Sequence, residues 1–133
     1  MPELRAVVYY TPNQDGRGTD MAFVEEIKKY DVQYHAGGKT ASGYQYRAII
    51  GLRRNDGSLI GGAYFHRDPS TMPNTDNQTS TGYVWCHYAW QDFPQVLDLL
   101  RNEKPVYVRY VAGGWEIGAV TTSMEPVGEG EQP

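Results

Sequence analysis

Short apolar runs separated by turn-forming residues recur along the chain, and this pattern predicts strands. Residues 4 to 10, LRAVVYY, are apolar and β-branched and end at the turn-rich TPNQDGRGT, so we expect a strand and then a loop. A long strand is expected over residues 44 to 54, after which NDG at 55 to 57 turns the chain back into SLIGGAYFHRD. Another strand is expected at 82 to 90. The intervening residues 68 to 81 are polar and without periodicity, which predicts a long exposed loop.

The faces of this first hairpin depend on its turn. If Asp56 and Gly57 form a two-residue turn, one continuous apolar face results from the pairs Arg54 with Leu59, Ile50 with Ala63 and Ala48 with Phe65. The opposite face then carries Arg47, Ile49, Arg53, Ile60, Tyr64 and His66. A three-residue loop with Gly57 in a bulge also fits the sequence, and a register slipped by one residue would exchange the partners.

The clearest helical pattern follows the strand expected at 82 to 90. Asp92 can cap a helix over residues 92 to 103, with Pro94 in its first turn and Pro105 beyond its end. The apolar positions follow the i, i+3, i+4, i+7 spacing that buries one face: Phe93, Val96, Leu97 and Leu100. Arg101 and Lys104 complement the dipole at its C-terminal end.

A shorter N-terminal helix is expected over residues 20 to 30. Thr19 or Asp20 can cap it, and its apolar side is formed by Met21, Val24 and Ile27. After the second helix, PVYVRYV and WEIGAVTTSM, joined by AGG, predict another hairpin. In it Val106, Val108 and Tyr110 share a face with Ile117, Ala119 and Thr121.

The order of these elements predicts an α+β fold. We expect a single domain over residues 1 to 124, built on a mainly antiparallel curved sheet of about six strands, with the helix at 92 to 103 packed on one face. Residues 125 to 133, EPVGEGEQP, have nothing to bury and predict a flexible acidic tail.

Composition refines this picture through aromatic content and charge. Aromatic residues make up 13% of the chain, which is typical of strands. The net charge is -4, and three of the negative charges belong to Glu125, Glu129 and Glu131 in the tail. A nearly neutral body argues against binding to duplex DNA by bulk charge. A single cysteine forms no internal disulfide, and no apolar run is long enough for a signal peptide or a membrane span, so we expect a cytoplasmic protein without membrane contact.

The adjacent residues Cys86 and His87 invite an interpretation as a catalytic or metal-binding pair. Neighbouring residues of a strand point to opposite faces, so the two side chains do not converge unless the strand bulges. The alternation places Cys86 in a core row with Val84, Tyr88 and Trp90, where an apolar setting raises the thiol pKa. The opposite row is a possible contact surface: Tyr83, Trp85 and His87.

Other candidate chemistry is weakly marked. GGKT at 37 to 40 resembles the end of a phosphate-binding loop, but Gln33 stands where the first glycine belongs and a strand follows instead of a helix. His66, Asp68, His35 and His87 do not have the spacing of a zinc signature. We therefore expect no metal, no cofactor and no catalytic residue. A small enzyme with a pocket near His66, Asp68 and His87 is the third hypothesis, and no reaction class follows from these residues.

The stronger hypotheses concern binding through an aromatic and basic sheet face. Its candidate binding residues are Arg47, Arg53, Tyr64, His66, Tyr83, Trp85 and His87. The first hypothesis is a non-catalytic binding or assembly module that forms a homodimer, because exposed Tyr and Trp are enriched in the cores of protein interfaces. The alternative is a binder of single-stranded nucleic acid, in which aromatic rings stack on bases and arginines contact the backbone.

Overall fold

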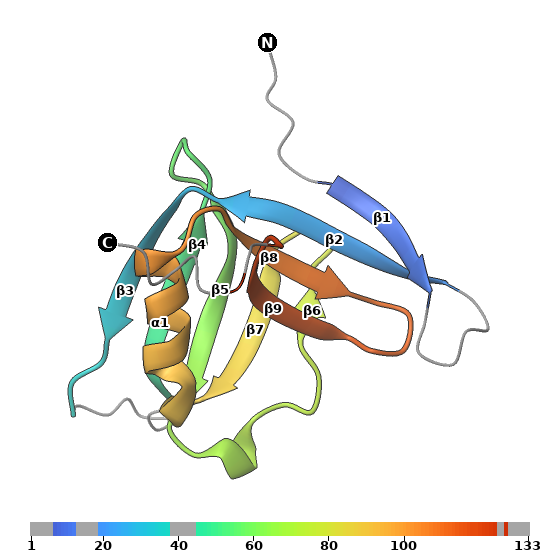
Figure 1. Cartoon of the computed structure of the whole chain (residues 1–133). Helices are drawn as coiled ribbons and strands as arrows, with labels where there is room; N and C mark the ends of the chain where they lie inside the picture. Colours follow the sequence, from blue (N-terminus) through green and yellow to red (C-terminus); the bar gives the residue numbers. More distant parts are fainter. Residues whose placement is uncertain (1–6, 13–18, 38–44, 125–126, 128–133) are drawn as a thin grey trace.

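A computed structural model describes residues 7–12, 19–37, 45–124 and 127 of the chain (Figure 1). Strands dominate, and they are accompanied by one α-helix and two short 3-10 turns. The strands are β1 (Val7–Pro12), β2 (Thr19–Ile27), β3 (Lys29–Tyr34), β4 (Tyr46–Arg53), β5 (Leu59–His66), β6 (Asn77–Gln78), β7 (Val84–Ala89), β8 (Val106–Val111) and β9 (Ile117–Thr122). The helical segments are α1 (Phe93–Asn102), η1 (Pro69–Thr71) and η2 (Trp90–Asp92). The mixed α and β content was predicted correctly, whereas the predicted acidic tail falls almost wholly outside the described residues.

The strands form two sheets, so the prediction of one curved sheet was wrong. The first sheet has the order β1-β2-β8-β9, and the second has the order β3-β4-β5-β7-β6. All neighbouring strands are antiparallel except β5 and β7, which are parallel. The sheets share one nearly continuous segment, because β2 runs into β3 through a bend at Lys28. There the Lys28 amide donates to the Arg53 carbonyl at 2.9 Å, which carries the chain from the first sheet into the second.

The N-terminal helix expected over residues 20 to 30 is absent, and β2 and the start of β3 take its place. β2 is a central strand that pairs with β1 on one side and β8 on the other, so tertiary pairing overrides the local helical spacing. Glu25 is buried in β2, whereas the predicted helix would have placed it on the exposed polar side. Its carboxylate accepts two hydrogen bonds from the Arg54 guanidinium, at 2.7 and 3.1 Å, and this pairing makes the burial tolerable.

The β4–β5 hairpin has the predicted core register, reached by a different turn. Ala48 pairs with Phe65 and Ile50 pairs with Ala63. The Arg54 amide donates to the Ser58 carbonyl at 2.8 Å, and Gly57 has a φ of 89°, so the loop is the three-residue alternative. A bulge between Leu52 and Arg53 then restores the register.

The same bulge reverses the sides of two residues next to the turn. Ile60, expected on the polar face, is fully buried in the core, whereas Leu59 is 42% exposed. The β8–β9 hairpin also departs from its predicted pairing by one residue, because Val108 pairs with Val120 and Tyr110 with Gly118. The loop between these strands takes in Trp115 and Glu116 besides AGG, which shifts every partner in β9. Ile117, expected on the same face as the buried Val106 and Val108, is therefore 49% exposed.

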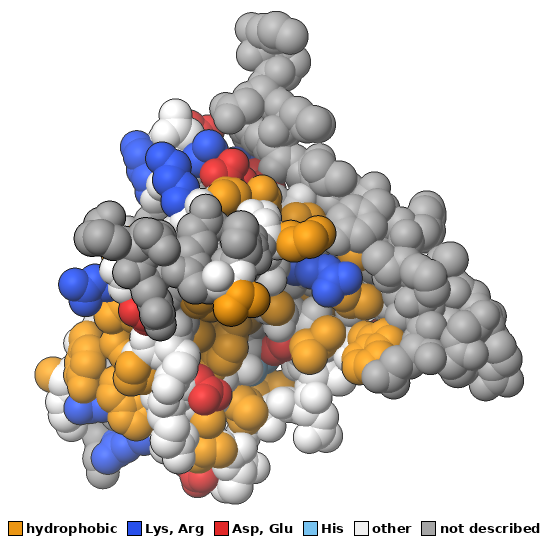
Figure 2. Space-filling model, in the orientation of Figure 1, with side chains coloured by type: hydrophobic (Ala, Val, Ile, Leu, Met, Phe, Trp, Pro, Cys, Tyr) orange, Lys and Arg blue, Asp and Glu red, His pale blue; other side chains and the backbone are white. Residues whose placement is uncertain are grey.

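The helix at 92 to 103 was predicted correctly, apart from one residue at each end. α1 buries Phe93 and Val96, and Leu97 and Leu100 pack against the same core. Figure 1 shows α1 with β8 and β9 on one side of the second sheet, and the core lies between them. In the same view Figure 2 shows hydrophobic side chains gathered over α1, and Lys and Arg side chains gathered near the β4–β5 turn. Among the described residues no helix is long and apolar enough to cross a bilayer.

Side chains replace a backbone ladder where the two sheets meet at β7 and β9. One carboxylate oxygen of Asp76 accepts from the His87 amide at 2.7 Å, and the other accepts from the Gly118 amide at 2.8 Å. Two residues further along β9, the Val120 amide donates to the Tyr88 hydroxyl at 3.3 Å. Gly118 permits this approach, because a Cβ there would lie 2.7 Å from the Cys86 Sγ. Asp76 thus ties β7 of the second sheet to β9, an edge strand of the first.

Candidate functional site

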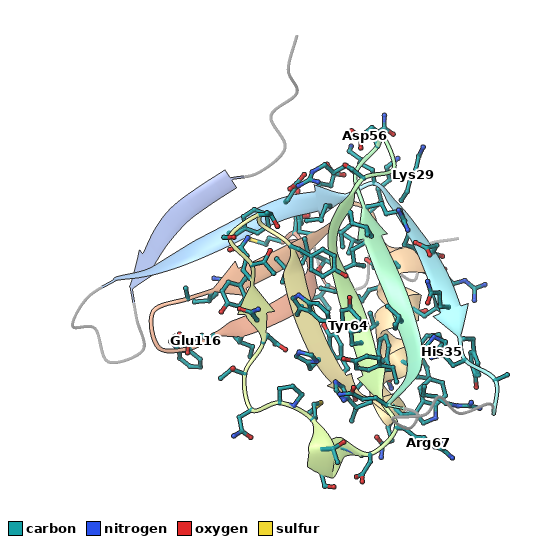
Figure 3. All side chains as sticks on the ribbon, turned by 180° about the vertical axis from the view of Figure 1, so that it is seen from behind. Lys29, His35, Asp56, Tyr64, Arg67 and Glu116 are labelled. Atoms are coloured by element: carbon teal, nitrogen blue, oxygen red, sulfur yellow. The ribbon has the colours of Figure 1, made fainter. Side chains whose placement is uncertain are left out.

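Six aromatic and histidine side chains gather on the side of the second sheet that faces away from α1. This outer aromatic face consists of Tyr46 from β4, Tyr64 and His66 from β5, and Tyr83, Trp85 and His87 in and just before β7. Figure 3 shows Tyr64 near its centre, seen from behind the sheet. The parallel pairing of β5 with β7 places Tyr64 beside His87, which is why residues distant in sequence meet here.

The rings of the outer aromatic face pack mainly against one another. Tyr64 stacks on Trp85 with centroids 4.5 Å apart, and Tyr46 meets Tyr64 at 5.1 Å. The Tyr64 and Tyr83 hydroxyls form a short hydrogen bond of 2.5 Å. Gly62 makes this meeting possible, because a Cβ at that position would lie 2.6 Å from the Tyr83 hydroxyl oxygen. Burial, with the hydrogen bond to Tyr83 as a further cause, raises the Tyr64 pKa far above its ordinary value, so its hydroxyl stays neutral.

The two histidines of the face form a direct pair. His66 Nε2 and His87 Nδ1 lie 2.9 Å apart, so one ring donates and the other accepts. Burial lowers the pKa of both rings, and for His66 the neighbouring His87 lowers it further. His66 is fully buried, and its Nδ1 has no hydrogen-bond partner among the residues that the structure describes. Both rings are therefore held neutral near pH 7, and a proton added to His66 would be buried without an acceptor.

The two predicted arginines are not part of this aromatic packing. The Arg53 guanidinium donates to the Asp31 carboxylate at 2.6 Å and to the Gly57 carbonyl at 2.8 Å. Arg53 still lies close enough to Tyr83 to lower the pKa of that phenol, although burial has the larger and opposite effect.

Arg47 is directed to the other end of the sheet. β4 is irregular between Tyr46 and Ala48, which removes Arg47 from the alternation on which the prediction relied. Its guanidinium lies over Tyr34 at 4.9 Å and Trp90 at 5.6 Å, and it donates to the His35 carbonyl at 2.7 Å. The basic component of the predicted nucleic-acid surface is therefore divided between two places.

Cys86 and His87 occupy opposite sides of β7, as strand alternation predicts. Cys86 is fully buried in the core, where desolvation raises its pKa well above the ordinary value and keeps it a thiol. Val84 is buried in the same row, and Tyr88 and Trp90 pack against the core. The adjacent pair in the sequence is therefore not a nucleophile and base in space.

The residues proposed for an enzyme pocket are brought together only in part. His66 and His87 are paired, whereas Asp68 accepts from the Ser70 amide at 3.0 Å and caps η1 in the exposed loop. His35 lies elsewhere, with Nδ1 2.9 Å from the Tyr46 carbonyl oxygen. Across the described part of the chain, no three His, Cys, Asp or Glu side chains are grouped so that they could hold a metal ion.

Two cavities lie away from the outer aromatic face. One, of about 610 Å³, is lined by Tyr34, His35, Ala36, Gly37, Arg47, Arg67 and Trp90. The other, of about 520 Å³, lies at the β2–β3 bend and draws cationic side chains from two distant segments, including Lys29 and Lys104. This second site was not predicted from the sequence, because those charges share no common motif and only the fold brings them together. Comparison of the chain with protein-family models, with curated proteins and with solved structures found no match.

Proposed function

We propose that this protein is a non-catalytic binding module that self-associates through the outer aromatic face. The observation that supports the proposal is the composition of that face, which consists of neutral aromatic and imidazole rings with no arginine or lysine among the packed side chains. Aromatic residues are enriched at the centres of protein interfaces, whereas lysine and the acidic residues are depleted there. A second copy of the same neutral aromatic surface is a partner with this interface composition.

The side chains of the outer aromatic face are ordered before any partner binds. Tyr64 and His66 are buried within the single chain, while Tyr83, Trp85 and His87 remain partly exposed beside them. The partly exposed rings are held by stacking and hydrogen bonds, so little side-chain entropy is lost when a partner covers them. A symmetric dimer with a two-fold axis would place the same residues on both sides of the interface.

The test compares two tryptophan variants in sedimentation-velocity runs from low to high micromolar protein. We expect the wild type to be dimeric at high concentration and Trp85→Ala to be monomeric. Trp115→Ala is the matched control, because Trp115 is 43% exposed in the β8–β9 loop, outside the face. Circular dichroism verifies that both variants fold. A wild type that remains monomeric at high micromolar concentration, or equal dimerisation of both variants, would contradict the proposal.

Binding of single-stranded nucleic acid is the second candidate, favoured by the electrostatic effect of Arg53 on Tyr83, whose pKa it lowers although burial raises that pKa more. The pairing of Arg53 with Asp31 at 2.6 Å weakens this candidate, since the carboxylate neutralises the cation that would meet a phosphate. Fluorescence anisotropy with a labelled oligonucleotide at low and high salt separates the two. Salt-dependent binding that is lost in Trp85→Ala and in Arg53→Gln would favour nucleic acid, and no binding at low salt would exclude it.

A further inference from the structure

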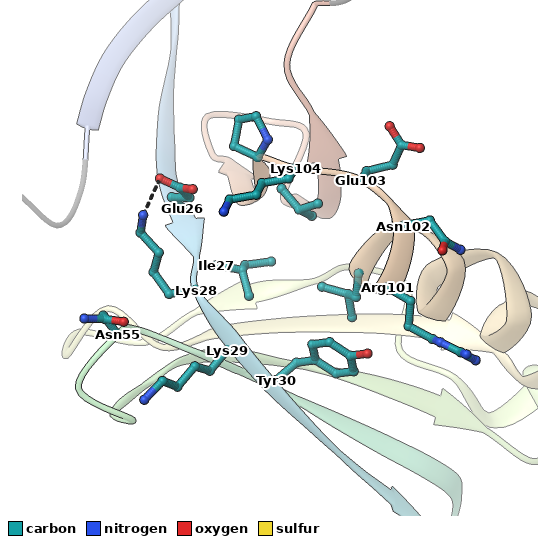
Figure 4. Close-up of a pocket in the computed structure, with 13 residues that line it drawn as sticks. Glu26, Ile27, Lys28, Lys29, Tyr30, Asn55, Arg101, Asn102, Glu103 and Lys104 are labelled. Carbon is teal, nitrogen blue, oxygen red and sulfur yellow. Dashed lines mark ion pairs between the residues drawn. The ribbon is translucent and has the colours of Figure 1, made fainter. Parts of the chain in front are cut away.

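The pocket at the β2–β3 bend is assembled from three parts of the chain. Figure 4 shows its walls, which are the bend itself, the β4–β5 turn, and the end of α1 with the start of β8. Its volume of about 520 Å³ lies within the usual range for small-molecule sites. The lining residues are Glu26, Ile27, Lys28, Lys29, Tyr30, Asn55, Leu100, Arg101, Asn102, Glu103, Lys104, Pro105 and Val106.

Positive charge predominates around this pocket, in a chain whose net charge is -4. Four cationic and two acidic residues line it, which gives a formal local charge of +2 (4 − 2). Among the described residues one of these cations is in an ion pair, since Lys28 Nζ lies 3.2 Å from Glu26 Oε1. The side chains of Lys29, Arg101 and Lys104 have no ion-pair or hydrogen-bond partner in that part of the chain. Unpaired cations around a concave site raise the local concentration of anions.

Apolar and aromatic side chains form part of the pocket wall beside the polar ones. Ile27 and Val106 belong to the buried core, and Tyr30 and Leu100 pack against it. In Figure 4 Ile27 and Tyr30 lie between the cationic side chains, with Lys104 extending across the pocket from the α1 side. A bare inorganic ion would leave this apolar surface unused. A ligand with an anionic group and a flat apolar body would contact both the rim and the interior.

We propose that this pocket binds a small organic anion that joins a phosphate-type group to a flat aromatic body, as a nucleotide does. The phosphate would be held by Lys29, Arg101 and Lys104, whose flexible side chains surround the opening. The aromatic body would lie against Tyr30 and Ile27, and the Asn55 amide offers a hydrogen-bonding group at the edge of the site. This site is separate from the outer aromatic face and does not depend on self-association.

The test is a titration of the ¹⁵N-labelled full chain with adenosine triphosphate at low salt, followed by NMR. We expect chemical-shift changes at residues 26–30 and 100–106, and none at Trp85. The double variant Lys29→Gln/Lys104→Gln should bind at least about tenfold more weakly, since two cations are lost. Lys104→Arg should retain binding because it keeps the charge. Arg67→Gln controls for the loss of a cation elsewhere on the protein, because Arg67 lies outside this pocket and its removal should leave the affinity unchanged.

Three outcomes would overturn the proposal. The first is the absence of shifts at millimolar nucleotide, and the second is shifts confined to other parts of the chain. The third is an equal loss of affinity in Arg67→Gln and in the double variant, which would indicate a general charge effect. Inorganic pyrophosphate provides a further arm: weaker binding than the nucleotide supports a role for Tyr30 and Ile27, whereas equal binding refutes the aromatic part of the proposal.

Discussion

Substitution of Asp76 tests whether one carboxylate holds the two sheets together. Asp76→Asn keeps one oxygen acceptor but places an NH₂ group against the second amide donor, at either His87 or Gly118. A hydrogen bond to a charged group contributes about 1.5–3 kcal/mol. Asp76 is partly exposed, so water can reach a vacated donor, and we take the lower end of that range. The expected loss of unfolding free energy is about 1.5 kcal/mol for Asn and about 3 kcal/mol for Ala, which removes both bonds.

The assay is urea unfolding followed by tryptophan fluorescence. With a urea slope of about 1.5 kcal/mol per molar, the midpoint should fall by about 1 M for Asp76→Asn and about 2 M for Asp76→Ala. Asp68→Asn is the matched control in the same loop, because the Asp68 carboxylate lies in solvent and, within the described residues, accepts hydrogen bonds from Ser70 alone. It should change stability by less than about 0.5 kcal/mol. Hydrogen exchange should accelerate selectively at the amides of His87 and Gly118. Equal midpoint shifts at Asp76 and Asp68 would refute the tie between the sheets.

Three further predictions follow from the packing. Gly62→Ala should cost about 1–3 kcal/mol in a thermal unfolding measurement, because the added Cβ displaces the Tyr83 hydroxyl; an unchanged melting temperature would show that the face is loosely packed. The pKa values of His66 and His87 are lower in the folded protein than in the unfolded chain, so the unfolded chain takes up protons first as the pH drops. The urea midpoint should therefore fall below roughly pH 6.5. His66→Phe should make the urea midpoint depend less on pH. The raised pKa of Cys86 predicts a thiol that resists iodoacetamide in the folded protein and reacts in urea, and rapid labelling without urea would contradict its burial.

The parts of the fold that were predicted correctly are those in which local signals and tertiary pairing agree. α1 carries its own periodicity, a proline in the first turn and a proline beyond its end. The β4–β5 core register was also correct, although the turn was the alternative one, because the bulge near Arg53 compensated for the extra loop residue. β2 was mistaken for a helix, because Met21, Val24 and Ile27 have helical spacing, and only the pairing with the flanking strands decides for a strand.

Predicting the site required knowledge of non-local pairing that alternation does not supply. The outer row of β7 could be read from the sequence, since Tyr83, Trp85 and His87 are two residues apart. Its contact with Tyr64 depends on the parallel pairing of β5 with β7 across the exposed loop, and no turn signal encodes that pairing. The irregularity near Arg47 then removed a cation that simple alternation had assigned to the same face. The residues on one face of a single strand can thus be predicted, but the charge of the whole sheet face depends on bulges and on the neighbouring strands. Here an irregularity in β4 directs Arg47 elsewhere, and Asp31 of β3 pairs with Arg53, which leaves an aromatic surface.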